Sequence, residues 1–313
     1  MILDVVNPAK APVSVLVLSR DEAANIGECL ESLRWADEVF VVDSLSTDRT
    51  AEIARALQAK VHLHPFVGYA DQRNWALQNL PFAHDWVLML DADERIPKAL
   101  ADEISVAVSR QDTYSGFYMA RRIFFMGTWL KHGGLYPTWL LRLFKRQRAR
   151  VEERPVNEHV IVNGSVGYLA HPFDHADRRP LGDWVTKQNR YADLQTEEYL
   201  REKSRLGFTS SIRANLRGSQ AERKRWIKLR IWNRLPLLFR PFLFFTCNYF
   251  LRGGFLDGRA GFIYHILWSF WIKFLIDVKV MERESTSRRR GSASETGDRV
   301  QAIKSQSKKA AAS

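Results

Sequence analysis

An apolar run that ends in three carboxylates is the feature that most constrains the fold of this chain. Residues 85–95 read Asp-Trp-Val-Leu-Met-Leu-Asp-Ala-Asp-Glu-Arg. Residues 87–90 are apolar without alternation, which is typical of strands covered on both faces in parallel sheets flanked by helices. Because carboxylates are rarely buried unpaired, we expect Asp91 and Asp93 at the carboxyl end of this strand, the edge where open α/β sheets bind ligands.

Other apolar segments repeat this pattern along the first half of the chain. We predict strands at residues 13–19, 39–42, 61–64, 86–91 and 116–120, and helices at 22–33, 48–57, 69–80 and 96–108, and a further apolar run follows at 139–144. Residues 127–134 read as a loop. Strands that alternate with helices of about ten residues are typical of βαβ units. The fold class that follows is α/β, with a doubly wound, mostly parallel sheet.

The carboxylates at the strand ends suggest a cation site. Asp91 and Asp93 together could reach a hard divalent ion, Mg²⁺ or Mn²⁺, which keeps open positions for diphosphate oxygens. The same D-x-D pattern also occurs in acidic surface turns. Asp43 ends the second strand at a corresponding point, which favours a nucleotide site at this edge, although a single acid at a strand end is more often a cap for the next helix. The glycine-rich dinucleotide and P-loop signatures are absent from the sequence, so a nucleotide would be held through a metal.

Five blocks of sequence, in their order and spacing, resemble family 2 glycosyltransferases. The blocks are residues 14–22, 35–38, 41–48, 72–74 and 90–95. They look most like the bacterial branch that includes the lipopolysaccharide core β-1,4-glucosyltransferases, and the resemblance covers about residues 13–280. It implies a GT-A fold, a nucleotide-diphosphate sugar donor, a divalent metal and inversion at the anomeric carbon.

The resemblance also assigns roles to the acids. Asp43 matches the residue that contacts the base of the nucleotide, and Glu22 lies in the loop beside it. Asp91 matches the acid near the ribose and diphosphate. Asp93 matches the principal metal ligand, with Asp91 beside it.

Arg73 and Asn74 match the start of a helix that faces the same nucleotide pocket. Three positions depart from the family pattern. Asp21 stands where the family usually has Asn, and Leu45 and Arg49 stand where it usually has Gly. The last two departures are expected to reshape the loop after the second strand.

Inverting transfer needs a base that takes the proton from the acceptor hydroxyl, and a carboxylate downstream of the metal site is the economical choice. Glu158 is the candidate, because residues 154–159 resemble a Val-His-Glu block of this branch, with Asn157 in place of the His. An exposed Glu is otherwise most often a solvated surface charge. The rival candidates are Glu152, Glu153, Asp174 and His159.

The positive charge of the chain is confined to its last third. Residues 1–200 have a net charge of −4 and residues 201–313 a net charge of +16. A domain specialised for nucleic acid would carry the positive charge on its folded unit, so we expect no nucleic-acid partner. Residues 283–313 hold many Ser, Ala and basic residues and little to bury, and are expected to be a disordered basic tail.

The segment 261–280 has two helical faces. One is apolar and aromatic, and the other carries a polar residue at every fourth position. This stripe consists of His265, Ser269, Lys273 and Asp277. Three interpretations compete: a pair of spanning helices, a soluble helical subdomain, and a monotopic platform whose aromatic helices lie in the membrane interface while Lys and Arg face anionic headgroups. We favour the platform, which would be a C-terminal helical membrane-associating region.

The predicted organisation is a nucleotide-sugar and catalytic domain at 1–180, a basic, aromatic helical region at 181–282 and the tail. The first twelve residues lack the apolar core of a signal peptide, so we expect the cytoplasmic face of the bacterial inner membrane. The resemblance implies transfer of a hexose, with glucose from UDP-glucose as the expected donor, onto a lipid-linked glycan. The alternatives are a polyprenyl-phosphate glycosyltransferase and a degenerate domain that binds membranes or nucleic acid.

Overall fold

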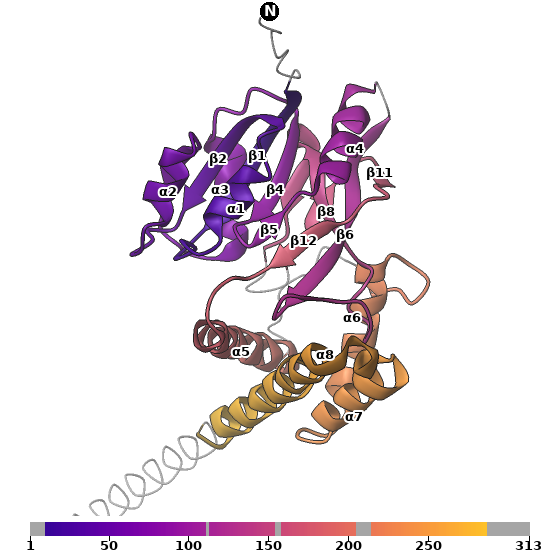
Figure 1. The fold of residues 1–313 in the computed structure, drawn as a ribbon. Helices are drawn as coiled ribbons and strands as arrows, with labels where there is room; N and C mark the ends of the chain where they lie inside the picture. Colours follow the sequence, from indigo (N-terminus) through magenta and orange to yellow (C-terminus); the bar gives the residue numbers. More distant parts are fainter. Residues whose placement is uncertain (1–9, 111–112, 154–157, 205–213, 287–313) are drawn as a thin grey trace, which may run out of the picture.

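A computed structural model describes residues 10–110, 113–153, 158–204 and 214–286. Figure 1 shows a sheet flanked by helices, with a separate group of helices beside its lower edge. The main sheet has the strand order β3-β2-β1-β4-β8-β6-β12-β5, and β7 and β11 pair with β6. A second, two-stranded sheet consists of β9 and β10.

The first half of the main sheet is parallel and buried. Strand β1 (Ala11–Ser19) lies between β2 (Ala36–Asp43) and β4 (Trp86–Asp91), and β3 (Lys60–Leu63) extends the sheet beyond β2. Strands β1, β2 and β4 are rich in Val and Leu, and most of their central residues are buried, whereas the edge strand β3 is half-buried or exposed. The predicted doubly wound sheet is therefore confirmed for this half.

The second half of the sheet is mixed. Strand β8 (Thr138–Lys145) runs antiparallel to β4, and β6 (Tyr114–Phe125) runs antiparallel to β8. Strand β12 (Phe173–Ala176) pairs with β6 in parallel and with β5 (Glu94–Arg95) antiparallel.

The remaining strands are short. They are β7 (Thr128–Leu130), β9 (Ala149–Val151), β10 (Val160–Val162) and β11 (Ser165–Tyr168). The loop predicted at 127–134 was wrong in part, because residues 128–130 form β7. This strand folds back on β6 and places Leu130 in a buried contact with Ile123.

Helices cover both faces of the sheet. One core lies under α1 (Ile26–Glu31), α2 (Thr50–Ala56) and α4 (Lys98–Ser109), and the other lies under α3 (Tyr69–Asn79). A short 3₁₀ turn, η1 (Arg146–Arg148), connects β8 to β9.

The chain then enters the helical region. Its first helices are α5 (Leu181–Lys203), α6 (Gln220–Arg230) and α7 (Arg240–Thr246), with the 3₁₀ turn η2 (Trp232–Arg234) and the π-helical η3 (Cys247–Leu251). A long C-terminal helix spans Gly254–Thr286 and includes η4 (Gly254–Asp257), α8 (Gly258–Tyr264) and the π-helical η5 (His265–Trp271). It packs against α5 through a small apolar cluster that contains Ala192, Ile272, Ile276 and Val280.

The polar stripe of this C-terminal helix faces inward. The sequence separates the two faces of this helix without indicating which of them is buried. His265, Ser269 and Asp277 are buried, while Lys273 is half-buried. His265 Nδ1 bonds to Ser269 at 2.9 Å and Asp277 pairs with Arg240, while His265 Nε2 has no hydrogen-bond partner in the described part of the chain. The predicted apolar face, in contrast, is half-buried or exposed throughout.

By length and composition, the helix Gly254–Thr286 could cross a membrane. Its most apolar 18-residue window has a mean hydropathy of 1.3. Core helices of soluble proteins can meet the same criterion, so composition alone does not separate spanning from packing.

Candidate active site

The carboxyl ends of β1, β2 and β4 bring the predicted acids to one edge of the sheet. In the register of the parallel strands, Leu18 of β1 lies beside Asp91 of β4, and Ser19 lies beside Asp43 of β2. Strand β1 is also the point where the strand order reverses, from β2 and β3 on one side to β4 on the other. Open α/β sheets bind ligands at such a point.

Asp91 is held between two arginines. Its carboxylate accepts hydrogen bonds from Arg73 at 2.8 Å and from Arg142 at 2.9 Å. Arg142 also donates to the buried Glu94 at 2.6 Å, and the Asp91 amide donates to the other oxygen of Glu94 at 3.0 Å. Burial alone would raise the pKa of Asp91, but Arg142 and Arg73 outweigh it and lower the pKa to about 2. Asp91 is therefore a fixed anion at neutral pH.

Asp93 is buried and faces three basic groups. Its Oδ2 lies 3.4 Å from Lys187 Nζ, 3.5 Å from His175 Nε2 and 4.0 Å from Arg179 Nη2. Burial raises the pKa of this carboxyl, but His175 and Lys187 outweigh it and hold the pKa well below its usual range. Asp93 therefore carries a charge in a site from which water is largely excluded.

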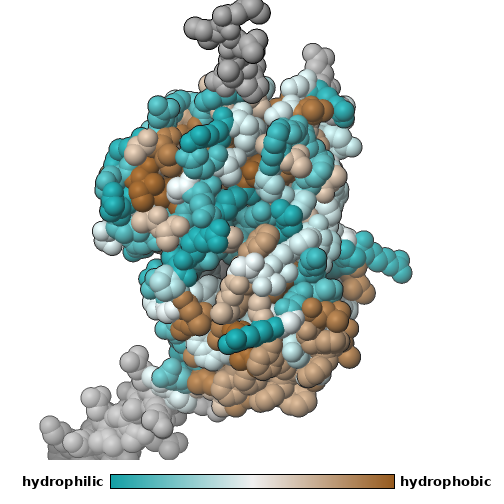
Figure 2. Space-filling view, viewed as in Figure 1, coloured by the Kyte–Doolittle hydropathy of each residue, from teal (hydrophilic) through white to brown (hydrophobic). Residues whose placement is uncertain are grey.

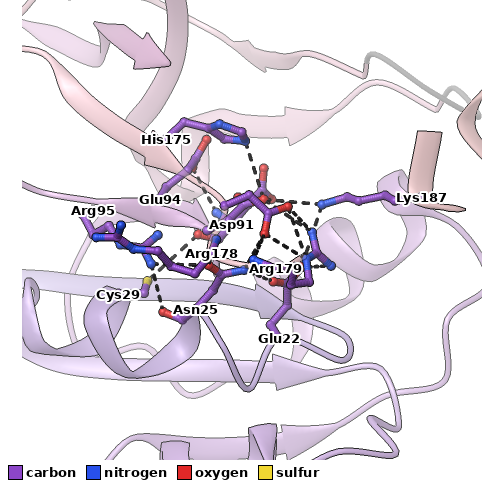
Figure 3. A network of polar contacts seen from close by, with 12 residues as sticks. Glu22, Asn25, Cys29, Asp91, Glu94, Arg95, His175, Arg178, Arg179 and Lys187 are labelled. Atoms are coloured by element: carbon purple, nitrogen blue, oxygen red, sulfur yellow. Dashed lines mark hydrogen bonds and ion pairs between the residues drawn. The ribbon is translucent and has the colours of Figure 1, made fainter. Parts of the chain in front are cut away.

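Glu22 belongs to the same cluster. It pairs with Arg179 at 3.0 Å, accepts a hydrogen bond from Asn25 at 2.7 Å and lies 3.8 Å from Lys187. Burial, followed by repulsion from Asp93, raises its pKa to about 7. Figure 3 shows Glu22, Arg179 and Lys187 converging at this edge, with His175 approaching from the opposite side.

Glu158 reaches the site through Arg73. The guanidinium of Arg73 forms an ion pair with Glu158 through one nitrogen and with Asp91 through the other. Both carboxylates therefore meet at one buried arginine, and the candidate base lies next to the edge of β4.

The rival bases are placed differently. Asp174 is paired with Arg122 at 2.6 Å, and the buried Glu152 lies 3.6 Å from His159. Glu153 is exposed.

Two predicted nucleotide-contacting residues, Asp43 and Asn74, already form hydrogen bonds within the protein. The Asp43 carboxylate is buried and accepts hydrogen bonds from the Ser46 amide at 2.8 Å, the Ser46 hydroxyl at 2.5 Å and the Ser19 hydroxyl at 3.0 Å. These contacts close the turn after β2, whereas α2 begins at Thr50 with Arg49 as its N-cap residue and has no side-chain cap from Asp43. Asn74 uses both ends of its side-chain amide on the backbone of Val151, which ties α3 to β9. Of the pocket residues on α3, only Arg73 reaches the carboxylate cluster in the described residues.

The donor set can be tested against a divalent cation. Within the described ranges, no group of three or more His, Cys, Asp or Glu side chains is arranged to hold a metal alone. Asp93 Oδ2 and His175 Nε2 nevertheless offer an oxygen and an imidazole nitrogen that lie 3.5 Å apart. Mg²⁺ is commonly held by one or two carboxylates together with substrate phosphates. The residues therefore fit a cation that is shared with a diphosphate.

Sequence reasoning missed the cations that surround these acids. Arg142 comes from β8, Arg179 follows β12 and Lys187 lies on α5, far from Asp91 and Asp93 in sequence. A general signal was available, because buried carboxylates need partners. Local spacing could not say which of the many basic residues supply them.

A cavity in the helical region lies away from the carboxylate cluster. A space of about 470 Å³ lies between the end of α5 and the C-terminal helix, and Glu197, Arg201 and Glu284 are among its lining residues. Glu197 is ten residues, or about 15 Å of helix, beyond Lys187.

The sheet order and the charged edge define an α/β enzyme domain with a ligand site at the switch point of its sheet. A sequence profile described as "Glycosyl transferase family 2" matches residues 14–175, from β1 into β12. The chain belongs to this family and is a glycosyltransferase, as the resemblance of the five blocks indicated.

One relative matches over nearly the whole chain, and another is more similar over a shorter stretch. The "Lipopolysaccharide core biosynthesis glycosyltransferase LpsC" of Rhizobium meliloti is 27% identical over 288 residues, which is 90% of this chain and 96% of the relative. An uncharacterised glycosyltransferase of Rickettsia bellii is 42% identical over 108 residues, which is 34% of this chain and 36% of the relative.

Solved structures match more distantly. Glucosyl-3-phosphoglycerate synthase from Mycobacterium tuberculosis, in complex with phosphoglyceric acid, is 17% identical, with 56% of this chain and 75% of that chain covered and a TM-score of 0.39. The complex of that synthase with Mn²⁺ and UDP-glucose gives 23% identity, 36% and 44% coverage and a TM-score of 0.31. Both scores are low, so the description of the fold rests on the strand order given above.

Proposed function

We propose that this glycosyltransferase moves a hexose, glucose from UDP-glucose in our proposal, onto a lipid-linked glycan such as a lipopolysaccharide core or exopolysaccharide intermediate. The observation that carries the proposal is the cluster of Glu22, Asp91 and Asp93 at the switch point, with Glu158 attached through Arg73. The family of the chain and its relative with a lipopolysaccharide core name support the same choice.

In this proposal, Asp93 and His175 hold Mg²⁺ or Mn²⁺ together with the donor diphosphate. When bound, the cation would neutralise the charge that develops on the departing diphosphate. Lys187 and Arg179 already lie within 4.0 Å of Asp93, so they would add positive charge beside the same oxygens. Preorganised cations of this kind stabilise a leaving group without reorganising during the reaction.

Glu158 is the proposed base. It would take the proton of the acceptor hydroxyl while that oxygen attacks the anomeric carbon, so no covalent sugar–enzyme intermediate forms. Arg73 would orient Glu158 and fix its distance from Asp91. The side chain of Glu158 is only 10% exposed, which limits competition from water.

The base assignment is tested by Glu158→Gln, with Glu153→Gln as the matched control on an exposed acid nearby. General-base catalysis typically contributes about 10²–10⁴-fold, so the first variant should lose transfer by that factor while the control keeps it. Both should retain UDP binding. Transfer that survives Glu158→Gln would instead favour the polyprenyl-phosphate alternative, because a phosphate acceptor needs no strong base.

The donor site is tested by the shift in melting temperature with UDP and Mg²⁺. A ligand at 100 times its dissociation constant stabilises the native state by about 2.7 kcal/mol. Asp93→Asn should abolish the metal-dependent part of this shift, whereas Asp102→Asn, on the exposed surface of α4, should not. If no nucleotide diphosphate stabilises the wild type, the degenerate binding module is favoured. A panel of nucleotide sugars, assayed for metal-dependent hydrolysis, then identifies the donor without an acceptor.

We also propose that the helical region docks on the cytoplasmic face of the inner membrane. Large apolar side chains are exposed along α7, η3 and the first turns of the C-terminal helix. They form an apolar face made of Phe239, Phe242, Leu243, Phe250, Leu251, Phe255, Leu256 and Phe262. Figure 2 shows it as a broad brown area below the mostly teal sheet domain. Contiguous apolar surface of this kind is rare on soluble monomers and is typical of membrane or protein contacts.

Vesicle sedimentation tests the docking. Leu251 is 80% exposed on the apolar face, and Val67 is 78% exposed on the sheet domain. Leu251→Ser combined with Phe242→Ser should weaken sedimentation with vesicles that contain phosphatidylglycerol, while Val67→Ser should leave it unchanged. Equal sedimentation of all variants would contradict the proposal.

A further inference from the structure

Three basic side chains meet where the catalytic sheet joins the helical region, and the proposed chemistry does not use them. They are Arg121 on β6, Lys224 on α6 and Arg252, which directly follows η3. We propose that this cluster binds an anionic group, a phosphomonoester, on the sugar acceptor. The inference rests on the proposed transfer to a glycan and specifies one feature of that acceptor.

Backbone and side-chain contacts bring the three residues together at the start of β8. Arg121 is the register partner of Thr138. On either side of Thr138, Gln220 of α6 accepts a hydrogen bond from the Trp139 amide at 3.0 Å and donates to the Pro137 carbonyl at 3.1 Å. Lys224 follows Gln220 by one helical turn and so lies on the same face of α6.

Arg252 is attached to the loop that leads into β8. Its carbonyl accepts a hydrogen bond from the Gly133 amide at 3.0 Å. Its guanidinium lies over Gly134, where an added Cβ would come within 2.7 Å of Nη1. Gly134 has a φ of +75°, a conformation that glycine adopts without strain. The loop therefore leaves space that the Arg252 side chain fills.

The cluster lacks compensating acids in the part of the chain that the structure describes. None of the three residues has an ion pair there, and Arg121 Nε is buried without a hydrogen-bond partner. The nearby acids are engaged elsewhere: Glu222 forms a capping box with Ser219, and Asp257 binds His132.

The three positive charges of the cluster repel one another. Although Lys224 is an exposed residue on α6, desolvation of its ammonium lowers its pKa, and Arg121 and Arg252 lower it further. Like charges that face each other without a counterion destabilise the folded state, and a bound anion would relieve that cost.

The position of the cluster favours an acceptor over a bulk lipid headgroup. Arg121 pairs with Phe173 of β12, and His175 lies two residues further along the same strand. With strands about 4.8 Å apart and two residues spanning about 6.7 Å, the Cα atoms of Arg121 and His175 are about 8 Å apart. Because His175 contacts Asp93, the cluster lies within a few sugar units of the carboxylates. An anion bound here would belong to the molecule being glycosylated.

The test uses the full chain with ¹³C-dimethylated lysines, in which the Lys224 signal is assigned by Lys224→Arg. UDP and Mg²⁺ are present to occupy the donor site, and glucose 6-phosphate is the probe. We expect the probe to shift the Lys224 signal and raise the lysine pKa, whereas glucose has no effect. Arg121→Gln and Arg252→Gln should each weaken the apparent affinity about tenfold or more, since a hydrogen bond to a charged group contributes about 1.5–3 kcal/mol. Lys98→Gln, an equal change of charge on the exposed surface of α4, should not.

Three results would overturn the inference. One is a Lys224 signal that does not respond to glucose 6-phosphate, and another is a response that is unchanged in Arg121→Gln and Arg252→Gln. The third is a response to phosphatidylglycerol vesicles alone, which would assign the cluster to headgroups. The shift in melting temperature with UDP is measured on the same variants and should be preserved. Its loss in the wild type would count against the proposed function, not against the cluster.

Discussion

The buried ion pair between Arg240 and Asp277 should dominate the stability of the helical region. It joins α7 to the C-terminal helix, and both side chains are almost completely buried. Arg240 donates to Asp277 at 2.8 Å and 2.5 Å, and the Leu238 amide donates to the other carboxylate oxygen at 2.9 Å. The guanidinium also lies over the rings of Tyr199 at 4.9 Å and Trp232 at 5.0 Å. Each of the two buried charges is therefore neutralised mainly by the other.

Asp277→Leu leaves the Arg240 charge buried without an anion. Loss of one partner of a buried pair costs about 3–5 kcal/mol, whereas replacement of both partners by apolar residues is often nearly neutral. We therefore expect Asp277→Leu to lower the free energy of unfolding by about 4 kcal/mol, which is a factor of about 10³ in the unfolding equilibrium. The double variant Arg240→Met, Asp277→Leu should recover most of this loss.

Urea unfolding in detergent micelles, followed by tryptophan fluorescence, measures these changes. The control is Asp102→Leu, which breaks the exposed pair with Lys98 on α4 and should cost less than about 1 kcal/mol. If Asp277→Leu is as mild as this control, or if the double variant is no more stable than the single one, the pair is not desolvated as described. Our explanation of the inward-facing polar stripe would then fail.

Three further predictions concern single residues. Cys29 is fully buried and burial raises the pKa of its thiol, so native protein should leave it unmodified by iodoacetamide while the half-buried Cys247 reacts; mass spectrometry after urea unfolding should find both modified. Burial raises the pKa of Glu22 from 4.5 to about 7. Its ionisation therefore leaves the free energy of unfolding unchanged below pH 4.5, and lowers it by about 3 kcal/mol as the pH rises to 7. In metal-free protein, the free energy of unfolding of Glu22→Gln relative to wild type should therefore increase between these pH values and level off above them. Gly133 has a φ of +67°, and a Cβ there would lie 2.2 Å from His265, so Gly133→Ala should lower the free energy of unfolding by about 1–3 kcal/mol or more in a urea titration.

The sequence was sufficient for the parallel half of the sheet and for its acidic edge. Apolar segments without alternation predicted β1, β2 and β4, because only strands covered on both faces need that pattern. Asp91 had to stand at the end of β4, since an unpaired carboxylate is rarely buried in the core. These conclusions depend on local composition, which a single sequence contains in full.

The partners of the acids could not be predicted in the same way. Arg142 reaches Asp91 and Glu94 because β8 pairs with β4, and Lys187 reaches Asp93 because α5 begins just after β12. Both contacts follow from the order in which strands and helices pack, which the spacing of residues in the sequence does not predict. The roles predicted for Glu158 and Asp43 remain predictions for the same reason, as does the domain boundary at residue 180.

The C-terminal helix shows which physical information periodicity lacks. A repeat of about 3.6 residues separates two faces, but it does not say which face is inside. In water, the hydrophobic effect buries the apolar face. Here His265, Ser269 and Asp277 are buried alongside the apolar cluster that packs on α5, while Phe262 is 47% exposed. This arrangement would be unfavourable for a helix surrounded by water and is favourable for one whose outer face contacts an apolar phase. The exposure of Phe262 thus bears on membrane docking more directly than hydropathy does, because hydropathy is the same whichever face is inside.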